Sequence, residues 1–312
     1  MKQYLKRFST SGGTATRLRP HDFRRFAAMA PYPFLTADYL SALAGGNPQC
    51  ITNRFKNLKR APNTYIKVAD YQRQNGSLFM NFPLAYALTD QTKEMLTNRG
   101  IRIHTTEFSG PFFHQLYSVQ TRASFDIAAQ EIDTVSIIGW DKLSTDQRVP
   151  QATRESDSPH HFDIPKSVRI PNQSQKLVSD CYPFIVQNTA LQNPAFHFLG
   201  LECDMGTETI GTTIRAKITY YRYLLENGIY KEKLGFPKAH VAFVTALPGR
   251  VESILKEIEK QTERTPNLRR YFLVKHSVAP NEWQPDLKPS PTGHMVTEPW
   301  RRVGLEPLYL HK

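Results

Sequence analysis

The fold of the first third of this chain is decided by residues 36–60, which read TADYLSALAGGNPQCITNRFKNLKR. Thr36 is a suitable N-cap for a short helix that the Gly-Gly pair at 45–46 ends. The Asn-Pro pair that follows has the residue types of a helix cap and a first helical turn. The stretch therefore predicts two helices joined by a glycine turn, the second running over 49–59.

Apolar and polar residues separate onto two faces of the second of these helices. Ile51, Phe55 and Leu58 recur at i, i+4 and i+7 and predict a buried face. The other positions carry residue types that bind base edges or phosphates. With Arg73 from a later loop, we expect them to form a DNA-binding surface: Gln49, Thr52, Asn53, Arg54, Lys56, Asn57, Lys59 and Arg60. The alternative is a three-helix packing module whose polar face is only solvated.

The sequence on either side completes the prediction of a winged helix-turn-helix domain over 20–105. Apolar residues at helical spacing predict a first helix within 20–34. After the glycine turn and the polar helix, we expect two short strands, a wing loop between them and a further helix: Tyr65–Val68, Leu78–Phe82, Ala69–Ser77 and Asp90–Asn98.

Positive charge is concentrated at the same end of the chain. The 312 residues carry a formal net charge of +12, and residues 1–60 hold eleven Lys or Arg against two acidic residues. Basic residues favour polyanionic partners because they displace counterions from phosphates. We expect residues 1–19 to be a flexible basic arm that holds the DNA backbone; a solubilising tail is the alternative.

Composition excludes several classes of protein. The sequence contains no run of about 18 apolar residues and no apolar segment after its basic N-terminus, so we expect a cytoplasmic protein without a membrane partner. Cys50, Cys181 and Cys203 have neither zinc-site nor disulfide spacing. No small-molecule cofactor is indicated.

Strands and helices alternate in the second half of the chain. A connector at 106–165 precedes an α/β domain at 166–280, and 281–312 is expected to be an irregular Pro-rich tail, so the whole chain is predicted to be α+β. The expected strands are Lys166–Pro171, Leu177–Asp180, Phe184–Gln187, Phe196–Asp204, Ala239–Thr245 and Arg270–Lys275. The expected helices are Phe125–Ile132, Thr209–Asn227 and Arg250–Thr262.

Acidic residues stand at the ends of two expected strands. Glu202 and Asp204 are two residues apart and share a face, and Asp180 ends an earlier strand. Adjacent like charges are unfavourable unless a cation offsets them, and Mg²⁺ is held by one or two carboxylates. Lys217, on the following helix, is expected to reach back and stabilise charge at a phosphate. Alternatively, Glu202, Asp204 and Glu208 cap that helix and pair with its basic residues.

The stretch FLGLECDMGTETIGTTIRAKITYYRYLLENG at 198–228 resembles the replication-relaxation family of plasmid and mobile-element proteins. The resemblance extends to YALTDQTKEMLTNRG at 86–100, LVSDCYPFIV at 177–186 and AHVAFVTALPGRVESIL at 239–255. It implies a winged helix joined to a restriction-endonuclease-like domain of the PD-(D/E)-X-K nuclease superfamily.

The resemblance also implies a set of site residues. Asp180 matches the acid of the first half-motif, after Ser179 in place of Pro, and Glu202 matches the acid of the second. Asp204 stands where such nucleases have Lys, so Lys217 is expected to supply that charge. The implied catalytic set is Asp180, Glu202, Asp204 and Lys217, with Mg²⁺ on Asp180 and Glu202.

These observations together predict a protein that binds double-stranded DNA as a homodimer and acts in replication initiation, replication control or DNA relaxation. Mg²⁺-dependent nicking is the enzymatic expectation. A non-catalytic regulator, in which the nuclease-like domain serves dimerisation or partner binding, is the alternative. An RNA-binding protein is a third interpretation, against which stands the deep major groove of A-form RNA.

Overall fold

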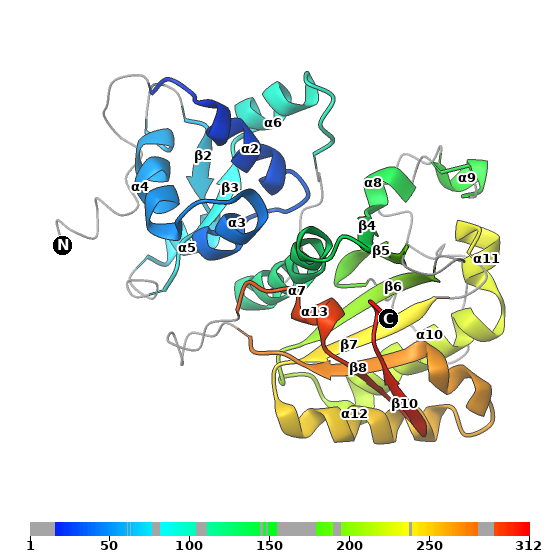
Figure 1. Cartoon of the computed structure of the whole chain (residues 1–312). Helices are drawn as coiled ribbons and strands as arrows, with labels where there is room; N and C mark the ends of the chain where they lie inside the picture. The colour runs from blue at the N-terminus through cyan, green and yellow to red at the C-terminus, as the bar shows by residue number, and fades with distance from the viewer. Residues whose placement is uncertain are drawn as a thin grey trace. The chain divides into compact units, whose positions relative to one another are not determined.

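The computed structural model describes residues 16–60, 62, 64–76, 82–103, 111–143, 146–147, 149–154, 179–189, 195–236, 239–279 and 290–312. These residues form an α+β protein with two compact units (Figure 1). The first unit comprises residues 1–123 and 280–292, and the second comprises 124–279 and 293–312. The division falls inside helix α7 (Phe112–Glu131), which belongs to both units.

The first unit combines helices with a small antiparallel sheet, whose strand order is β1-β3-β2. Its elements follow in the order α2 (Pro20–Met29), β1 (Leu35–Thr36), α3 (Ala37–Ala44), α4 (Pro48–Leu58), β2 (Ile66–Val68), α5 (Asp70–Gln74), β3 (Ala85–Leu88) and α6 (Asp90–Thr97).

The pair of helices predicted around the glycine turn is confirmed as α3 and α4. Asn47 caps α4, since its Oδ1 accepts hydrogen bonds from the backbone N–H groups of Gln49 at 2.9 Å and Cys50 at 3.3 Å. The apolar stripe of α4 is fully buried, and Phe55 packs edge-on against Tyr86 of β3 with ring centroids 5.0 Å apart. The helical period of the sequence therefore fixes which face of α4 enters the core.

The segment predicted to be a wing differs from expectation. The expected strand Leu78–Phe82 lies outside the described residues except for Phe82, which is in no strand; β2 pairs instead with β3. Asp70–Gln74, expected in a loop, forms α5. The buried Gln72 side chain explains this arrangement, because it accepts a hydrogen bond from the Ala85 N–H at 2.7 Å and donates one to the Pro83 carbonyl at 2.9 Å.

The second unit is built on a seven-stranded mixed sheet with the order β10-β9-β8-β7-β6-β5-β4. Strands β4, β5 and β6 are antiparallel, β6, β7 and β8 are parallel, and β8, β9 and β10 are antiparallel. The strands are β4 (Val135–Ile138), β5 (Cys181–Asn188), β6 (Ala195–Asp204), β7 (His240–Thr245), β8 (Phe272–His276), β9 (Trp300–Arg302) and β10 (Leu305–Leu308).

Helices cover both faces of this sheet (Figure 1). On one face, α10 (Arg215–Glu226), α11 (Ile229–Leu234) and α12 (Pro248–Gln261) enclose the main apolar core with alternate residues of β6, β7 and β8. On the other face, Phe125 of α7 packs against Phe184 of β5 and Trp300 of β9. The remaining helical segments are α8 (Trp140–Leu143), α9 (Gln151–Arg154), a π-helical turn η1 (Ile210–Ile214), a 3₁₀ turn η2 (Pro266–Tyr271) and α13 (His294–Thr297).

The predicted alternation of strands and helices is confirmed from β5 to β8. The expected strand Lys166–Pro171 lies outside the described residues, as do the first two residues of Leu177–Asp180. The expectation of an irregular tail at 281–312 is wrong for the described residues 293–308, which form α13, β9 and β10. Trp300 explains the difference, because its indole is fully buried and its Nε1 donates to the Met295 carbonyl at 2.8 Å.

Close packing of α13 against α7 gives a test of this arrangement. A Cβ on Gly293 would lie 2.7 Å from Cα of Ala128, a backbone atom that cannot swing aside. We expect Gly293→Ala to destabilise the protein by about 1–3 kcal/mol, the usual range for overpacking. Gly249→Ala is the matched control, since no atom lies within 4 Å of its added Cβ. Equal urea-unfolding midpoints for the two variants would contradict this packing.

Candidate functional site

The exposed face of α4 and the turn that ends it present a line of polar side chains. Gln49, Asn53, Lys56, Asn57 and Arg60 are exposed and follow one another at helical spacing. Gln49 Nε2 donates to Asn53 Oδ1 at 3.3 Å, and Lys56 Nζ donates to the same oxygen at 3.1 Å. These contacts engage the amide oxygen of the exposed Asn53, whose NH₂ group is a donor pair suited to a ligand.

Two residues predicted for this surface do not point to solvent. Arg54 has a side-chain exposure of 12%, and its Nη2 donates to Asp22 Oδ2 at 2.6 Å and to the Arg17 carbonyl at 2.8 Å. Lys59 ends the helix and is buried. The expected orientation was wrong for both; for Arg54 the reason is Asp22, a fully buried carboxylate on α2 that requires a counter-charge.

The other predicted residues of this surface are accessible to different degrees. Thr52 is half-buried on α4. Arg73 lies on α5, between β2 and β3, with 54% of its side chain exposed and its Nη2 3.3 Å from Asp70 Oδ1.

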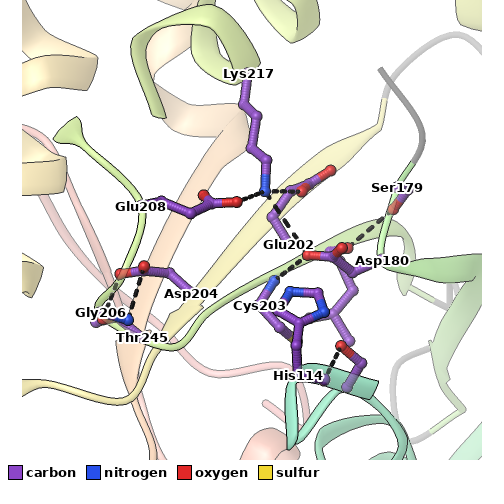
Figure 2. A network of polar contacts seen from close by, with 12 residues as sticks. His114, Ser179, Asp180, Glu202, Cys203, Asp204, Gly206, Glu208, Lys217 and Thr245 are labelled. Carbon is purple, nitrogen blue, oxygen red and sulfur yellow. Dashed lines mark hydrogen bonds and ion pairs between the residues drawn. The ribbon is translucent and has the colours of Figure 1, made fainter. Parts of the chain in front are cut away.

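In the second unit, the pairing of β5 with β6 brings Asp180 beside Glu202 (Figure 2). Asp180 directly precedes β5, and its backbone N–H donates to the Leu201 carbonyl at 3.1 Å. Its Oδ2 accepts from the Cys203 N–H at 2.7 Å. Glu202 lies in β6 with 1% exposure, on the sheet face that α10 covers.

Lys217 and Tyr221 of α10 both contact Glu202. The Lys217 ammonium lies 3.0 Å from Glu202 Oε2, 2.9 Å from Glu208 Oε1 and 3.8 Å from Asp180 Oδ2. The Tyr221 hydroxyl donates to Glu202 Oε1. Because residues four apart share a helix face, α10 presents both groups to one carboxylate. Lys217 thus reaches back to the sheet as the sequence predicted, and we refer to Asp180, Glu202, Glu208, Lys217 and Tyr221 as the acid–lysine cluster.

Burial controls the protonation of this cluster. Burial raises the pKa of Glu202 to about 7, although the Lys217 charge opposes the shift and the Asp180 charge adds to it. Burial would lower the pKa of Lys217, but the carboxylates of Glu202, Asp180 and Glu208 outweigh it and raise that pKa. Lys217 is therefore a permanent cation among three carboxyl groups.

Asp204 lies on the same strand but belongs to a separate network. Arg250 donates to it twice, from Nε to Oδ2 at 2.6 Å and from Nη2 to Oδ1 at 3.1 Å. Thr245 Oγ1 and the Gly206 N–H also donate to its oxygens, at 2.8 and 2.9 Å. The structure therefore brings Asp180, Glu202 and Lys217 together, while the Asp204 carboxylate is already neutralised by an arginine of α12.

Two partners of these acids, Tyr221 for Glu202 and Arg250 for Asp204, were not predicted from the sequence. Tyr221 could have been found, because it lies four residues after Lys217 on the same helix. Arg250 could not, because 46 residues separate it from Asp204 and no local pattern connects the two. Glu208 pairs with Lys217, which is one of the contacts allowed by the alternative of simple charge pairing; Arg215 pairs instead with Glu257 at 2.7 Å.

The cluster has oxygen ligands but no complete metal cage. Among the described residues, no three His, Cys, Asp or Glu side chains are arranged to hold a metal ion. Glu208 Oε2 is buried and accepts no hydrogen bond, and the buried Glu202 Oε2 has only the ion pair with Lys217. Three carboxyl groups around one ammonium leave an excess of acidic oxygen, which an additional cation would balance.

No protein-family model matches the chain, and comparisons with curated proteins and with solved structures find no significant similarity. In the described part of the chain, no helix is both long and apolar enough to cross a lipid bilayer.

The Tyr221 hydrogen bond predicts a stability effect in the absence of metal. In EDTA at pH 8, Tyr221→Phe should lower the free energy of unfolding by about 1–3 kcal/mol, because the buried Glu202 carboxylate is deprived of its donor. Tyr223→Phe on the same helix is the control and should change it by less than about 0.5 kcal/mol. Similar destabilisation of both variants, measured by urea unfolding, would show that the hydrogen bond contributes nothing specific.

The raised pKa of Glu202 predicts a pH dependence of stability. In the folded protein this carboxyl holds its proton up to about pH 7, whereas an ordinary glutamate releases it near 4.5. Folding therefore takes up a proton between these values, and the stabilisation present below pH 4.5 is lost as pH rises to 7. Relative to Glu202→Gln, the wild type should lose about 1–3 kcal/mol across this window in EDTA. Parallel stability–pH curves would show that Glu202 ionises normally.

Proposed function

We propose that this chain is a DNA-binding protein whose first unit is a winged helix-turn-helix that reads duplex sequence with α4. The observation that carries the proposal is the exposed line of Gln49, Asn53, Lys56, Asn57 and Arg60 on a helix whose opposite face is fully buried. Such a helix matches the width of the major groove and presents side chains that hydrogen-bond base edges.

The order of elements in the first unit supports the proposal. A helix, a short strand, two helices joined by a glycine turn, and two further strands follow one another, and β1 pairs with β3 at the sheet edge opposite β2. In the proposed domain, the segment between β2 and β3 would serve as the wing, and its helix α5 carries the exposed Arg73. An exposed arginine there suits a contact to the DNA backbone.

The chemistry of the α4 face indicates how sequence would be read. Asparagine and glutamine amides pair with adenine, and arginine or lysine pairs with guanine or with phosphate. Gln49, Asn53 and Asn57 supply the amides, while Lys56 and Arg60 supply the charges. The amides would therefore discriminate between bases, while the two charged side chains would add attraction to phosphates.

Metal-dependent cleavage of a DNA strand by the second unit is a second candidate function. The convergence of Asp180, Glu202 and Lys217 from two strands and a helix favours it. An all-oxygen donor set with surplus negative charge fits Mg²⁺, which binds one or two carboxylates and completes its shell with water and phosphate oxygens. Asp180 and Glu202 would hold the ion, which would polarise a phosphodiester and activate water.

The chain's own groups have distinct roles in this candidate. Lys217 carries a fixed positive charge that stabilises negative charge developing on a phosphate oxygen. Tyr221 holds Glu202 in one orientation through its hydroxyl. Asp204 has no part in the chemistry, because Arg250 and Thr245 occupy its oxygens and fix the end of β6.

The resemblance to replication-relaxation proteins favours a role in replication initiation or control, or in DNA relaxation, on a plasmid or another mobile element. A regulator without catalytic activity, with the second unit used for dimerisation or partner binding, is the alternative. A palindromic recognition sequence would favour binding by two copies of the chain.

Selection from random duplexes tests DNA reading. The purified protein should enrich one motif, and Asn53→Ala should weaken binding to it by about 1–3 kcal/mol and relax the preference at one base position. Lys93→Gln is the control, because this exposed lysine belongs to α6, a helix that Figure 1 shows on the other side of the first unit from α4. A motif and affinity that survive Asn53→Ala would remove α4 from the interface.

A plasmid assay tests cleavage. Supercoiled DNA incubated with the protein and Mg²⁺ or Mn²⁺ should be nicked, and Glu202→Gln should abolish the reaction while leaving DNA binding intact. Glu226→Gln, an exposed acid at the end of α10, is the control and should keep wild-type activity. Retardation of the plasmid without any nicking, with either metal, would favour the non-catalytic regulator.

A further inference from the structure

Arg25 is a buried arginine of α2 that lies beneath the turn between α3 and α4. Its exposure is 9%, and its Nη2 is 3.2 Å from the position that a Cβ on Gly46 would occupy. Gly46 has a φ of 101°, so the turn passes over the guanidinium with a conformation and a bare surface that only glycine allows. Arg25 therefore reaches the protein surface at the glycine turn rather than along its own helix.

The charge of Arg25 is poorly compensated within the first unit. Its nearest carboxylate is Asp22, whose Oδ1 lies 4.0 Å from Arg25 Nη1. Asp22 is already engaged by Arg54 at 2.6 Å and by the Arg19 N–H at 2.9 Å. Among the described residues, the Arg25 side chain makes no hydrogen bond with a protein group. Two guanidinium groups thus share one carboxylate, which leaves one positive charge in surplus in a largely buried place.

Burial and the neighbouring Arg54 charge act in the same direction on Arg25. Burial lowers the pKa of Arg25, the Asp22 charge opposes this shift, and the Arg54 charge adds to it, although the group remains fully protonated at neutral pH. An arginine kept charged under these conditions is unfavourable unless an anion completes its hydrogen bonds.

The N-terminus of α4 adds positive potential at the same place. This eleven-residue helix begins at Pro48, directly after the glycine turn, and the aligned peptide dipoles place partial positive charge at that end. The first N–H groups of α4 are capped by Asn47, so the helix end contributes field rather than free donors. Arg25 supplies the donors.

We propose that Arg25 and the turn at Gly45-Gly46 form a binding site for one backbone phosphate of duplex DNA. The site rests on the proposed DNA-binding function and adds an anchor to it: a phosphodiester group over the turn accepts hydrogen bonds from the guanidinium while α4 enters the adjacent groove. Arginine suits this role because its planar fork binds two phosphate oxygens at once. The absence of a side chain at Gly46 gives the phosphate access to the guanidinium.

The salt dependence of binding distinguishes a phosphate interaction from other effects. On duplex DNA, the slope of log K against log[salt] becomes shallower by about 0.9 for each phosphate that the protein no longer neutralises. Arg25→Gln should therefore reduce the slope by about one on a generic duplex and weaken binding to all sequences by a similar factor. Lys93→Gln on α6 is the matched control and should leave the slope unchanged. Arg25→Lys keeps the charge and should restore the slope.

The possible outcomes separate the phosphate site from the proposed function. If the wild type binds no duplex DNA, the proposed function fails; if it binds and Arg25→Gln keeps the wild-type slope, only the phosphate site is overturned. Melting temperatures of the variants are measured first. If Arg25→Gln is unfolded, the salt slopes of Arg25→Lys and Arg25→Met are compared instead, and equal slopes would overturn the phosphate site. Stabilisation of the wild type by inorganic phosphate at constant ionic strength, abolished in Arg25→Gln without any change in DNA slope, would assign the site to a free phosphate and overturn the DNA assignment.

Discussion

The contact between the Lys217 ammonium and the buried Glu202 carboxylate is the interaction on which the second unit's site depends. Both groups are removed from water when α10 packs on the sheet, and either one alone would leave an uncompensated charge in the core. The contact requires Glu202 to lie on the face of β6 that α10 covers. It also requires α10 to start directly after η1, so that Lys217 lies in its first turn. Asp180 joins this contact through the β5–β6 register, which carries it to the edge of the cluster.

The two units show the same electrostatic problem with opposite signs. In the first, Arg25 and Arg54 share Asp22, and positive charge is in excess. In the second, Asp180, Glu202 and Glu208 share Lys217, and negative charge is in excess. Neither surplus strengthens the fold, because burying unbalanced charge is unfavourable. Each surplus underlies one of the proposals made above, a DNA phosphate at the first and a divalent cation at the second.

The periodicity of the sequence predicted the elements of the fold that depend on residues close together in the chain. The buried stripe of α4, the Asn47 cap and the strands β5 to β8 follow from helical or strand patterns within a few residues, and the structure has them. Lys217 was predicted near the acids because a helix following a strand end packs back on that strand. These features need no information about distant parts of the chain.

Features set by partners far away in sequence were not predictable. Nothing near Arg54 indicates that its guanidinium binds Asp22, 32 residues earlier. The start of β3 at Ala85 depends on the Gln72 side chain, and the neutralisation of Asp204 depends on Arg250. In each case the fold brings a buried polar group next to a hydrogen-bond partner that is distant in sequence, and the residue types alone do not identify that partner.

The face of the second unit's sheet that α7 covers has a consequence for the order of folding. Ser124 Oγ lies 3.2 Å from His294 Nδ1, and the two residues are 170 positions apart. Phe125 stacks on Trp300, a pair of comparable separation. The β5–β6 hairpin needs only short-range pairing, and β9 lies 27 positions from its partner on β8, whereas the contacts of α7 with α13 and β9 close a loop of about 170 residues. Until α7 docks, Phe184 and Trp300 on this face of the sheet lack the cover of Phe125, so the slowest step of folding leaves apolar surface exposed to aggregation.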